Sequence, residues 1–146
     1  PSVCNAIETV LVNSAIAKDF LPRLKEVFDR CAVEIRGCEK TREIISCNEA
    51  TEEDWDTEYN DLICAVKVVA CERCAINHIN RYGTGHSEAI ITESRRDAEL
   101  FCTMVDAACV YVNASTRFTD GGETPVTITL NKEYGTHSWI FVRLKN

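Results

Sequence analysis

Apolar residues in this chain recur with two different periods. Short runs rich in β-branched residues predict strands at 8–12, 33–36, 62–70, 89–92 and 109–112. The run at 62–70 (LICAVKVVA) is almost continuously apolar, which is typical of a strand covered on both faces. We therefore expect this run to form a strand inside a sheet.

Between these runs, apolar residues lie three and four positions apart, which is the spacing of one buried helical face. The pattern predicts helices over 15–30, over 72–82 and after Ser94, where Ala98, Phe101, Cys102 and Val105 would share a face. The face of the first helix would be formed by Ile16, Phe20, Leu21, Leu24, Val27 and Phe28. Helix ends are marked by residues that suit caps, namely Asn13 or Ser14, Ser94, and Gly83 as a left-handed C-terminal cap.

Strands and helices alternate, which favours an α/β fold with a mostly parallel sheet flanked by helices. The acidic segment 51–61 begins with a Thr-x-x-Asp pattern, and we expect a short helix or turn there. The last part, 124–146, has a different character. Its runs at 127–130 and 139–142 predict two strands of a possible C-terminal β-hairpin.

Composition narrows the function classes. The 146 residues have 45% hydrophobic content, enough for one ordinary globular domain, and a net charge of −7 without a block of Lys or Arg. Nucleic acid and membrane surfaces are therefore not expected partners. Nine cysteines, an odd number, cannot all pair within one chain, and several fall in apolar patterns. We interpret them as packing residues of a cytoplasmic protein.

Spacing alone offers few chemical candidates. Cys4 lies beside an amide side chain just before a predicted strand, but a lone cysteine is more often inert packing than a nucleophile. Cys71 and Cys74 form a Cys-x-x-Cys, which we place inside a predicted helix with no strand-to-helix redox turn before it. Accidental surface cysteines are the favoured interpretation of that pair, and no metal site is expected. The 83–87 run (GTGHS) is interpreted as a connection with left-handed turns.

Four longer segments carry a resemblance. They are 3–12 (VCNAIETVLV), 50–69 (ATEEDWDTEYNDLICAVKVV), 78–93 (HINRYGTGHSEAIITE) and 110–123 (VYVNASTRFTDGGE). Together they closely resemble the gamma-glutamyl phosphate reductase family, within the aldehyde dehydrogenase superfamily. The resemblance implies that residues 1–123 are the catalytic-domain portion of such a reductase, that the cofactor-binding domain is absent, and that 124–146 is an unmatched tail.

The resemblance also implies an activity and its residues. The activity is NADPH-dependent reduction of gamma-glutamyl phosphate to L-glutamate 5-semialdehyde, with release of phosphate, in proline biosynthesis. Cys4 matches the catalytic cysteine, which would form a thioester, and Glu58 matches a glutamate near the cofactor ribose. The residues that match the substrate loop after the last predicted strand are Asn113, Ser115, Thr116 and Arg117.

Alternatives stay open. Glu58 could belong to a solvated acidic turn, and Arg117 could pair with Asp120 or Glu123 instead of a ligand. The chain could be a catalytically silent fragment or interaction module that retains the fold, or part of a coenzyme-A-acylating aldehyde dehydrogenase. A homo-oligomer is possible in either case.

Overall fold

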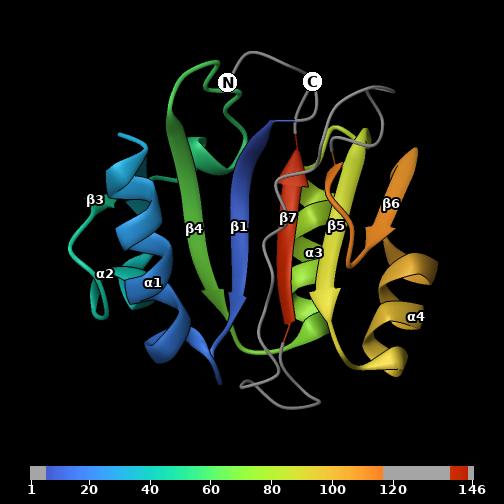
Figure 1. The fold of residues 1–146 in the computed structure, drawn as a ribbon. Coiled ribbons are helices and arrows are strands. Elements are labelled where there is room, and N and C mark those ends of the chain that lie inside the picture. The colour runs from blue at the N-terminus through green and yellow to red at the C-terminus, as the bar shows by residue number, and fades with distance from the viewer. Residues whose placement is uncertain (1–5, 117–138, 145–146) are drawn as a thin grey trace.

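The computed structural model describes residues 6–116 and 139–144 of the chain. These residues form a seven-stranded sheet with the order β3-β2-β4-β1-β7-β5-β6, shown in Figure 1. The strands are β1 (Ile7–Asn13), β2 (Glu34–Gly37), β3 (Asn48–Glu49), β4 (Ile63–Val69), β5 (Ser87–Thr92), β6 (Cys109–Val112) and β7 (Trp139–Leu144). β7 is antiparallel to both of its neighbours, and the other pairings are parallel. The expected α/β fold with a mostly parallel sheet is confirmed.

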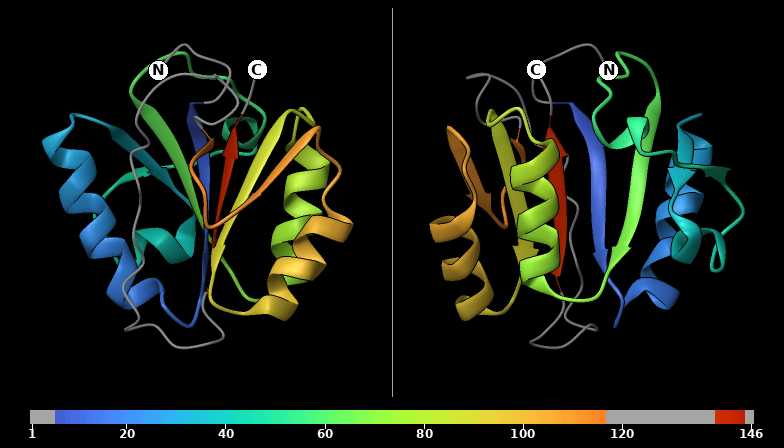
Figure 2. Two further views of the ribbon diagram at one scale, coloured as in Figure 1. Left: turned by 45° about the vertical axis from the view of Figure 1, so that its right-hand side comes forward. Right: turned by 180° about the vertical axis from the view of Figure 1, so that it is seen from behind.

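Helices cover both faces of this sheet, as Figures 1 and 2 show. They are α1 (Ala17–Arg30), α2 (Glu39–Arg42), α3 (Glu72–Tyr82) and α4 (Arg95–Met104), with a short 3-10 helix at Glu53–Trp55. One hydrophobic cluster joins α1 to β1, β2 and β4. A second cluster joins α3 and α4 to the other face of β1 and β5. Within the described residues, no helix is long and apolar enough to cross a membrane.

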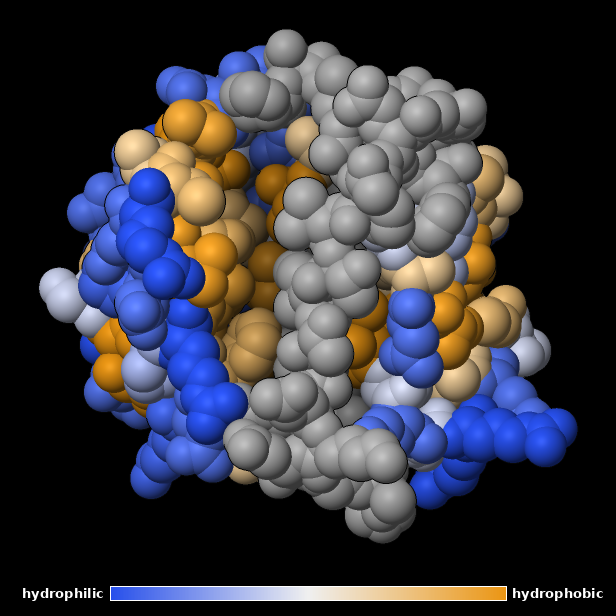
Figure 3. Space-filling view, viewed as in Figure 1, coloured by the Kyte–Doolittle hydropathy of each residue, from blue (hydrophilic) through white to orange (hydrophobic). Residues whose placement is uncertain are grey.

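Successive residues of the inner strands alternate between these two clusters. In β1, Val10 and Val12 pack on the α1 side, and Leu11 packs on the α3 side. In β4, Val68 and Val69 divide in the same way, so the prediction of a strand covered on both faces is confirmed. Figure 3 shows apolar side chains gathered on the sheet face beside α1, while polar side chains cover the outer surface of that helix.

Helix ends agree with the predictions only in part. The Ser94 Oγ accepts a hydrogen bond from the Asp97 N–H at 3.2 Å, so its predicted role as a cap is confirmed. The predicted cap of α1 is wrong, because its N-cap is Ile16, which makes no side-chain cap bond. Asn13 instead accepts a bond from the Ala15 N–H at 2.8 Å and closes a tight turn after β1.

Gly83 ends α3, but the prediction that it is left-handed is wrong. Its φ is −66°, and its N–H donates to the Ile79 carbonyl oxygen at 2.6 Å. A Cβ at this position would lie 2.5 Å from that same oxygen, so close approach, not φ, requires glycine here. The left-handed residue of the 83–87 run is Gly85, at φ +72°.

The tail contributes β7, which confirms the strand predicted at 139–142. Its register runs along β1 on one side and along β5 on the other, so both of its edges are occupied. The predicted hairpin, in which this strand would pair with 127–130, is therefore wrong for β7. The 127–130 run itself lies outside the described residues.

Candidate functional site

The predicted site residues lie in three segments of the chain. Cys4 and Arg117 fall outside the described residues. Glu58 is exposed in the loop that precedes β4. Because β1 and β4 are adjacent and parallel, the segments that precede them lie at the same edge of the sheet. The beginning of β1, three residues after Cys4, is thus near the Glu58 loop, at the top of Figure 1.

A hydrogen bond joins these two segments directly. The Tyr59 N–H donates to Glu8 Oε2 at 3.4 Å, from the residue next to Glu58. Glu8 is only 3% exposed although it carries a carboxylate in an apolar strand. A buried acid of this kind needs polar partners, and the loop backbone at Tyr59 supplies one of them. The contact therefore holds the Glu58 loop against the strand that follows Cys4.

Asp54 organises the loop itself. Its Oδ2 accepts bonds from the Thr51 N–H at 2.7 Å and the Thr51 hydroxyl at 2.9 Å. Its Oδ1 accepts bonds from Arg36 Nη1 and from the Tyr59 hydroxyl, each at 2.8 Å. Burial by itself raises the pKa of Asp54, but the bonds from Arg36, Thr51 and Tyr59 outweigh it and lower the pKa to about 2. Asp54 is therefore a charged centre that ties the loop to β2.

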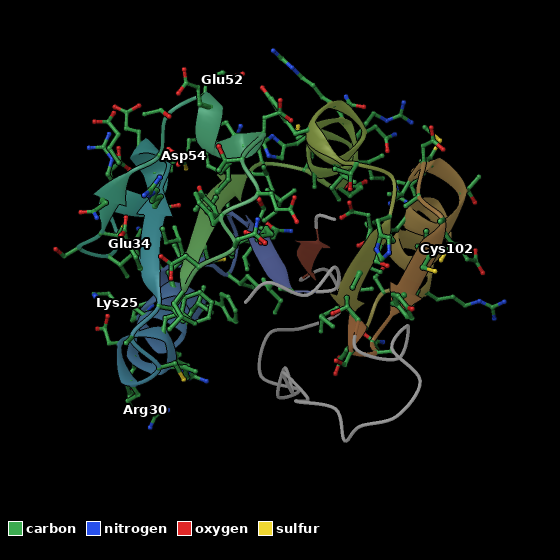
Figure 4. All side chains as sticks on the ribbon, turned by 90° about the horizontal axis from the view of Figure 1, so that it is seen from above. Lys25, Arg30, Glu34, Glu52, Asp54 and Cys102 are labelled. Atoms are coloured by element: carbon green, nitrogen blue, oxygen red, sulfur yellow. The ribbon has the colours of Figure 1, made fainter. Side chains whose placement is uncertain are left out.

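The same bonds confirm the short helix predicted from the Thr-x-x-Asp pattern, because the Asp54 carboxylate reaches back to the Thr51 N–H ahead of the 3-10 helix. Figure 4 shows Asp54 on the same flank of the sheet as Glu34. Glu34 also accepts a bond from Arg36 Nε at 2.9 Å. Arg36 thus lies between two carboxylates, and their hydrogen bonds raise its pKa.

Tyr59 completes the support of Glu58. The Arg36 guanidinium carbon lies 5.2 Å from the centre of the Tyr59 ring, within the range of a cation–π contact. Burial, followed by the hydrogen bond to Asp54, raises the pKa of the Tyr59 phenol. The phenol consequently stays protonated at neutral pH and donates to Asp54. Tyr59, the residue next to Glu58, is therefore fixed both by its backbone N–H and by its side chain.

A second set of contacts anchors the loop to α3. Trp55 is 4% exposed, and its ring meets the edge of the His78 ring at a centroid distance of 5.3 Å. Lys67 Nζ lies 4.8 Å from the centre of the Trp55 ring and 3.3 Å from His78 Nδ1. Tyr82, one turn along α3, packs on His78 at 4.6 Å and donates its hydroxyl to Glu52. This cluster links the loop to β4 and α3 at once.

The segment after β6 begins with a sharp turn at Asn113, which has a φ of +52°. The Asn113 amide accepts from the Thr92 N–H and donates to the Thr92 carbonyl oxygen, each at 2.8 Å. The chain then runs back toward the edge of the sheet where β1 begins, as both views show (Figures 1 and 2). Ser115 is half-buried and Thr116 is buried on this returning segment. The turn at Asn113 therefore directs the predicted substrate loop toward the end of the sheet where the Glu58 loop lies.

Sequence reasoning missed the roles of Glu8 and Arg36, and for Asp54 it predicted only the local pattern with Thr51. The acidic Glu8 inside an apolar strand pattern was a usable signal, because a buried carboxylate requires partners. The pairing of Arg36 with Asp54 carried no such signal, since the two residues lie 18 positions apart in the sequence. The resulting arrangement offers an exposed carboxylate, Glu58, that is able to accept bonds from paired hydroxyl groups.

Comparisons with known proteins agree with the predicted resemblance. No protein-family model matches the chain. Gamma-glutamyl phosphate reductase of Nautilia profundicola is 55% identical over 136 residues, which cover 90% of this chain and 33% of that protein. The enzyme of the same name from Thermoanaerobacter sp. is 60% identical over 124 residues, covering 84% of this chain and 30% of that protein. The chain therefore spans about a third of the length of these relatives.

Solved structures agree with the sequence comparison. The crystal structure of gamma-glutamyl phosphate reductase from Thermotoga maritima matches with a TM-score of 0.82 and 47% identity, covering 100% of this chain and 38% of that chain. The Saccharomyces cerevisiae enzyme of the same name matches with a TM-score of 0.62 and 27% identity, covering 86% of this chain and 36% of that chain. The chain is thus homologous to a segment of gamma-glutamyl phosphate reductase.

Proposed function

We propose that this chain supplies the catalytic cysteine and parts of the cofactor and substrate sites for NADPH-dependent reduction of gamma-glutamyl phosphate to L-glutamate 5-semialdehyde, a step of proline biosynthesis. The observation that carries the proposal is its 55–61% identity to reductases of that name over segments of 122 to 136 residues. The bond between Tyr59 and Glu8 supports it, because it brings the strand after Cys4 together with the Glu58 loop.

Cys4 is the proposed nucleophile. Its thiolate attacks the carbonyl carbon of the acyl phosphate, a carbon–sulfur bond forms, and the bond from that carbon to the phosphate oxygen breaks. Phosphate leaves with the electron pair, and the glutamyl group stays on Cys4 as a thioester. NADPH, when bound, supplies the hydride that turns the acyl group into the aldehyde. Release of the aldehyde returns the sulfur to its starting state.

Glu58 is the proposed cofactor residue. Its side chain is exposed, while the loop that carries it is fixed by the bond of Tyr59 to Asp54 and by the contact of Trp55 with His78. A carboxylate in this setting accepts two hydrogen bonds from the vicinal hydroxyls of a ribose without first having to order its own backbone. The residues present therefore fit a nucleotide cofactor at this edge of the sheet.

The loop after β6 is the proposed substrate segment. The side-chain oxygen and the side-chain nitrogen of Asn113 both bond to the Thr92 backbone, so we assign Asn113 to positioning the loop. The hydroxyls of Ser115 and Thr116 and the guanidinium of Arg117 are the proposed ligands for the substrate. A guanidinium binds a carboxylate or a phosphate through two parallel hydrogen bonds, and gamma-glutamyl phosphate carries both groups.

Acylation of Cys4 tests the proposal without the cofactor. The chain is incubated with freshly generated gamma-glutamyl phosphate, quenched in acid and mapped by peptide mass spectrometry. We expect a glutamyl group on Cys4 and release of an equal amount of phosphate. Cys4→Ser should abolish the adduct, whereas Cys31→Ser, which changes an exposed cysteine of α1's C-terminal end, should not. A chain that acquires no glutamyl group on Cys4 would contradict the assignment.

The second candidate is a catalytically silent module that retains the fold. Adding NADPH to the acylated chain separates the two. Release of glutamate semialdehyde supports a competent chain, and an acylated chain that stays unchanged supports the silent one.

A further inference from the structure

Two cysteines lie where β4 passes into α3. β4 ends at Val69, Cys71 is the N-cap residue of α3 with φ −152° and ψ 160°, and Cys74 lies in the first helical turn. The expectation that this pair sits inside a helix with no strand-to-helix turn before it is therefore wrong. The Cys-x-x-Cys occupies the junction between a buried strand and the start of an 11-residue helix. This is the position from which such a pair carries out redox chemistry.

The two cysteines are in direct contact. The Cys74 N–H donates to Cys71 Sγ at 3.2 Å, and both cysteines are free thiols. A hydrogen bond with Cys71 raises the pKa of the Cys74 thiol. The sulfur of Cys71 also stands at the N-terminus of α3, where unpaired N–H groups and the helix dipole favour a negative charge. Its position at the helix start therefore makes Cys71 the attacking sulfur of the pair, with Cys74 held beside it.

Exposure fits these two roles. Cys71 is half-buried and Cys74 is exposed, so a small molecule reaches the pair from solvent. Cys102, by contrast, is exposed in the last turns of α4, and that helix contains no second cysteine. Figure 4 shows Cys102 on the outer flank of the sheet. It therefore provides a matched single-thiol control.

We propose that Cys71 and Cys74 form a thiol–disulfide exchange site for small-molecule disulfides of the glutathione type. The Cys71 thiolate attacks one sulfur of glutathione disulfide, a mixed disulfide forms, and the first glutathione leaves as a thiolate. Cys74 then loses its proton and attacks the Cys71 sulfur, closing a Cys71–Cys74 disulfide and releasing the second glutathione. Two protein thiols are oxidised, and one disulfide is reduced to two thiols.

The site is independent of the proposed reductase function. Cys71 follows the carboxyl end of β4, whereas Glu58 precedes the amino end of the same strand. The two sites therefore lie at opposite edges of the sheet. Failure of one leaves the other untouched, because thiol exchange needs neither Cys4 nor NADPH.

Peptide mapping of the whole chain tests the proposal. The reduced chain is treated with glutathione disulfide, alkylated in acid and digested with trypsin, which cuts after Lys67, Arg73 and Arg81. Because one cut falls between the two cysteines, their disulfide joins peptide 68–73 to peptide 74–81. We expect this joined pair to be the main product, and to form about tenfold or more faster than glutathione attaches to Cys102.

Variants separate the roles of the two sulfurs. Cys74→Ser should trap glutathione on Cys71, and Cys71→Ser should slow modification of Cys74 to the rate of Cys102. Cys102→Ser should leave the joined peptides unchanged. If glutathione instead accumulates on Cys71, Cys74 and Cys102 at similar rates without any joined peptide, the pair is not an exchange site.

Discussion

Arg36 and Asp54, 18 positions apart in the chain, form an ion pair with 2.8 Å between Arg36 Nη1 and Asp54 Oδ1. The Asp54 side chain is 6% exposed and that of Arg36 is 32% exposed, so the carboxylate is buried while the Arg36 side chain keeps partial contact with solvent. It joins β2 to the loop that carries Glu58. The same Asp54 oxygen accepts the Tyr59 hydroxyl. The position of the proposed cofactor carboxylate therefore depends on a contact between two distant segments.

Replacing Asp54 with asparagine should lower the free energy of unfolding by about 2 kcal/mol or more, because Arg36 would lose its buried charged partner. Urea unfolding at neutral pH measures this. Asp106→Asn makes the same chemical change at an exposed side chain and should shift the unfolding free energy by less than about 0.5 kcal/mol. Equal effects of the two substitutions would contradict the assigned role of Asp54.

Stability should also depend on pH through Asp54. Its pKa falls from the usual 3.8 to about 2 in the folded chain, so the folded state holds the carboxylate more strongly than the unfolded state does. The resulting stabilisation is fully present above about pH 4 and is lost as pH falls toward 2. We expect the unfolding free energies of the wild type and Asp54→Asn to converge over this interval. A constant difference from pH 7 to pH 2 would disprove the linkage.

Gly83→Ala should destabilise the fold by about 1 to 3 kcal/mol, because the added Cβ would lie 2.5 Å from the Ile79 carbonyl oxygen. Thermal unfolding measures the loss. Gly85 offers a contrast, since its restriction comes from φ +72° and the nearest atom to an added Cβ is 3.5 Å away. There, Gly85→Asn should be better tolerated than Gly85→Ala, because asparagine adopts the left-handed region more readily. At Gly83, asparagine should give no such relief.

Asn113→Ala should cost about 1 to 3 kcal/mol, because the Thr92 N–H and carbonyl oxygen would both lose their partner. Asn60 is the matched control. It has a similar φ of +51° against +52° for Asn113, but among the described residues its side chain makes no hydrogen bond like those of Asn113 to Thr92. Asn60→Ala should therefore report the backbone cost alone, and the difference between the two variants isolates the hydrogen bonds. Denaturant unfolding that gives the same value for both would refute this account.

Periodicity predicted the elements well because it records which face of each element is buried. The stripe on α1 is an example, since Phe20, Leu21 and Leu24 are buried as expected. The same pattern erred at its margins, where Val27 is 45% exposed and Cys102 is exposed. Both residues lie at the border of the buried face, because their neighbours Phe28 and Phe101 still pack on the core.

Local sequence thus determined the α/β class, the buried strand at 62–70 and the resemblance that points to Cys4 and Glu58. Only the tertiary structure decided that β7 lies between β1 and β5, that Tyr59 bonds to Glu8, and that Arg36 pairs with Asp54. The physical reason is the range of each interaction. The buried face of a single helix or strand sets the spacing of apolar residues along it, so the sequence shows that face directly. Strand order and ion pairs between distant residues form only when separate segments meet in the folded chain.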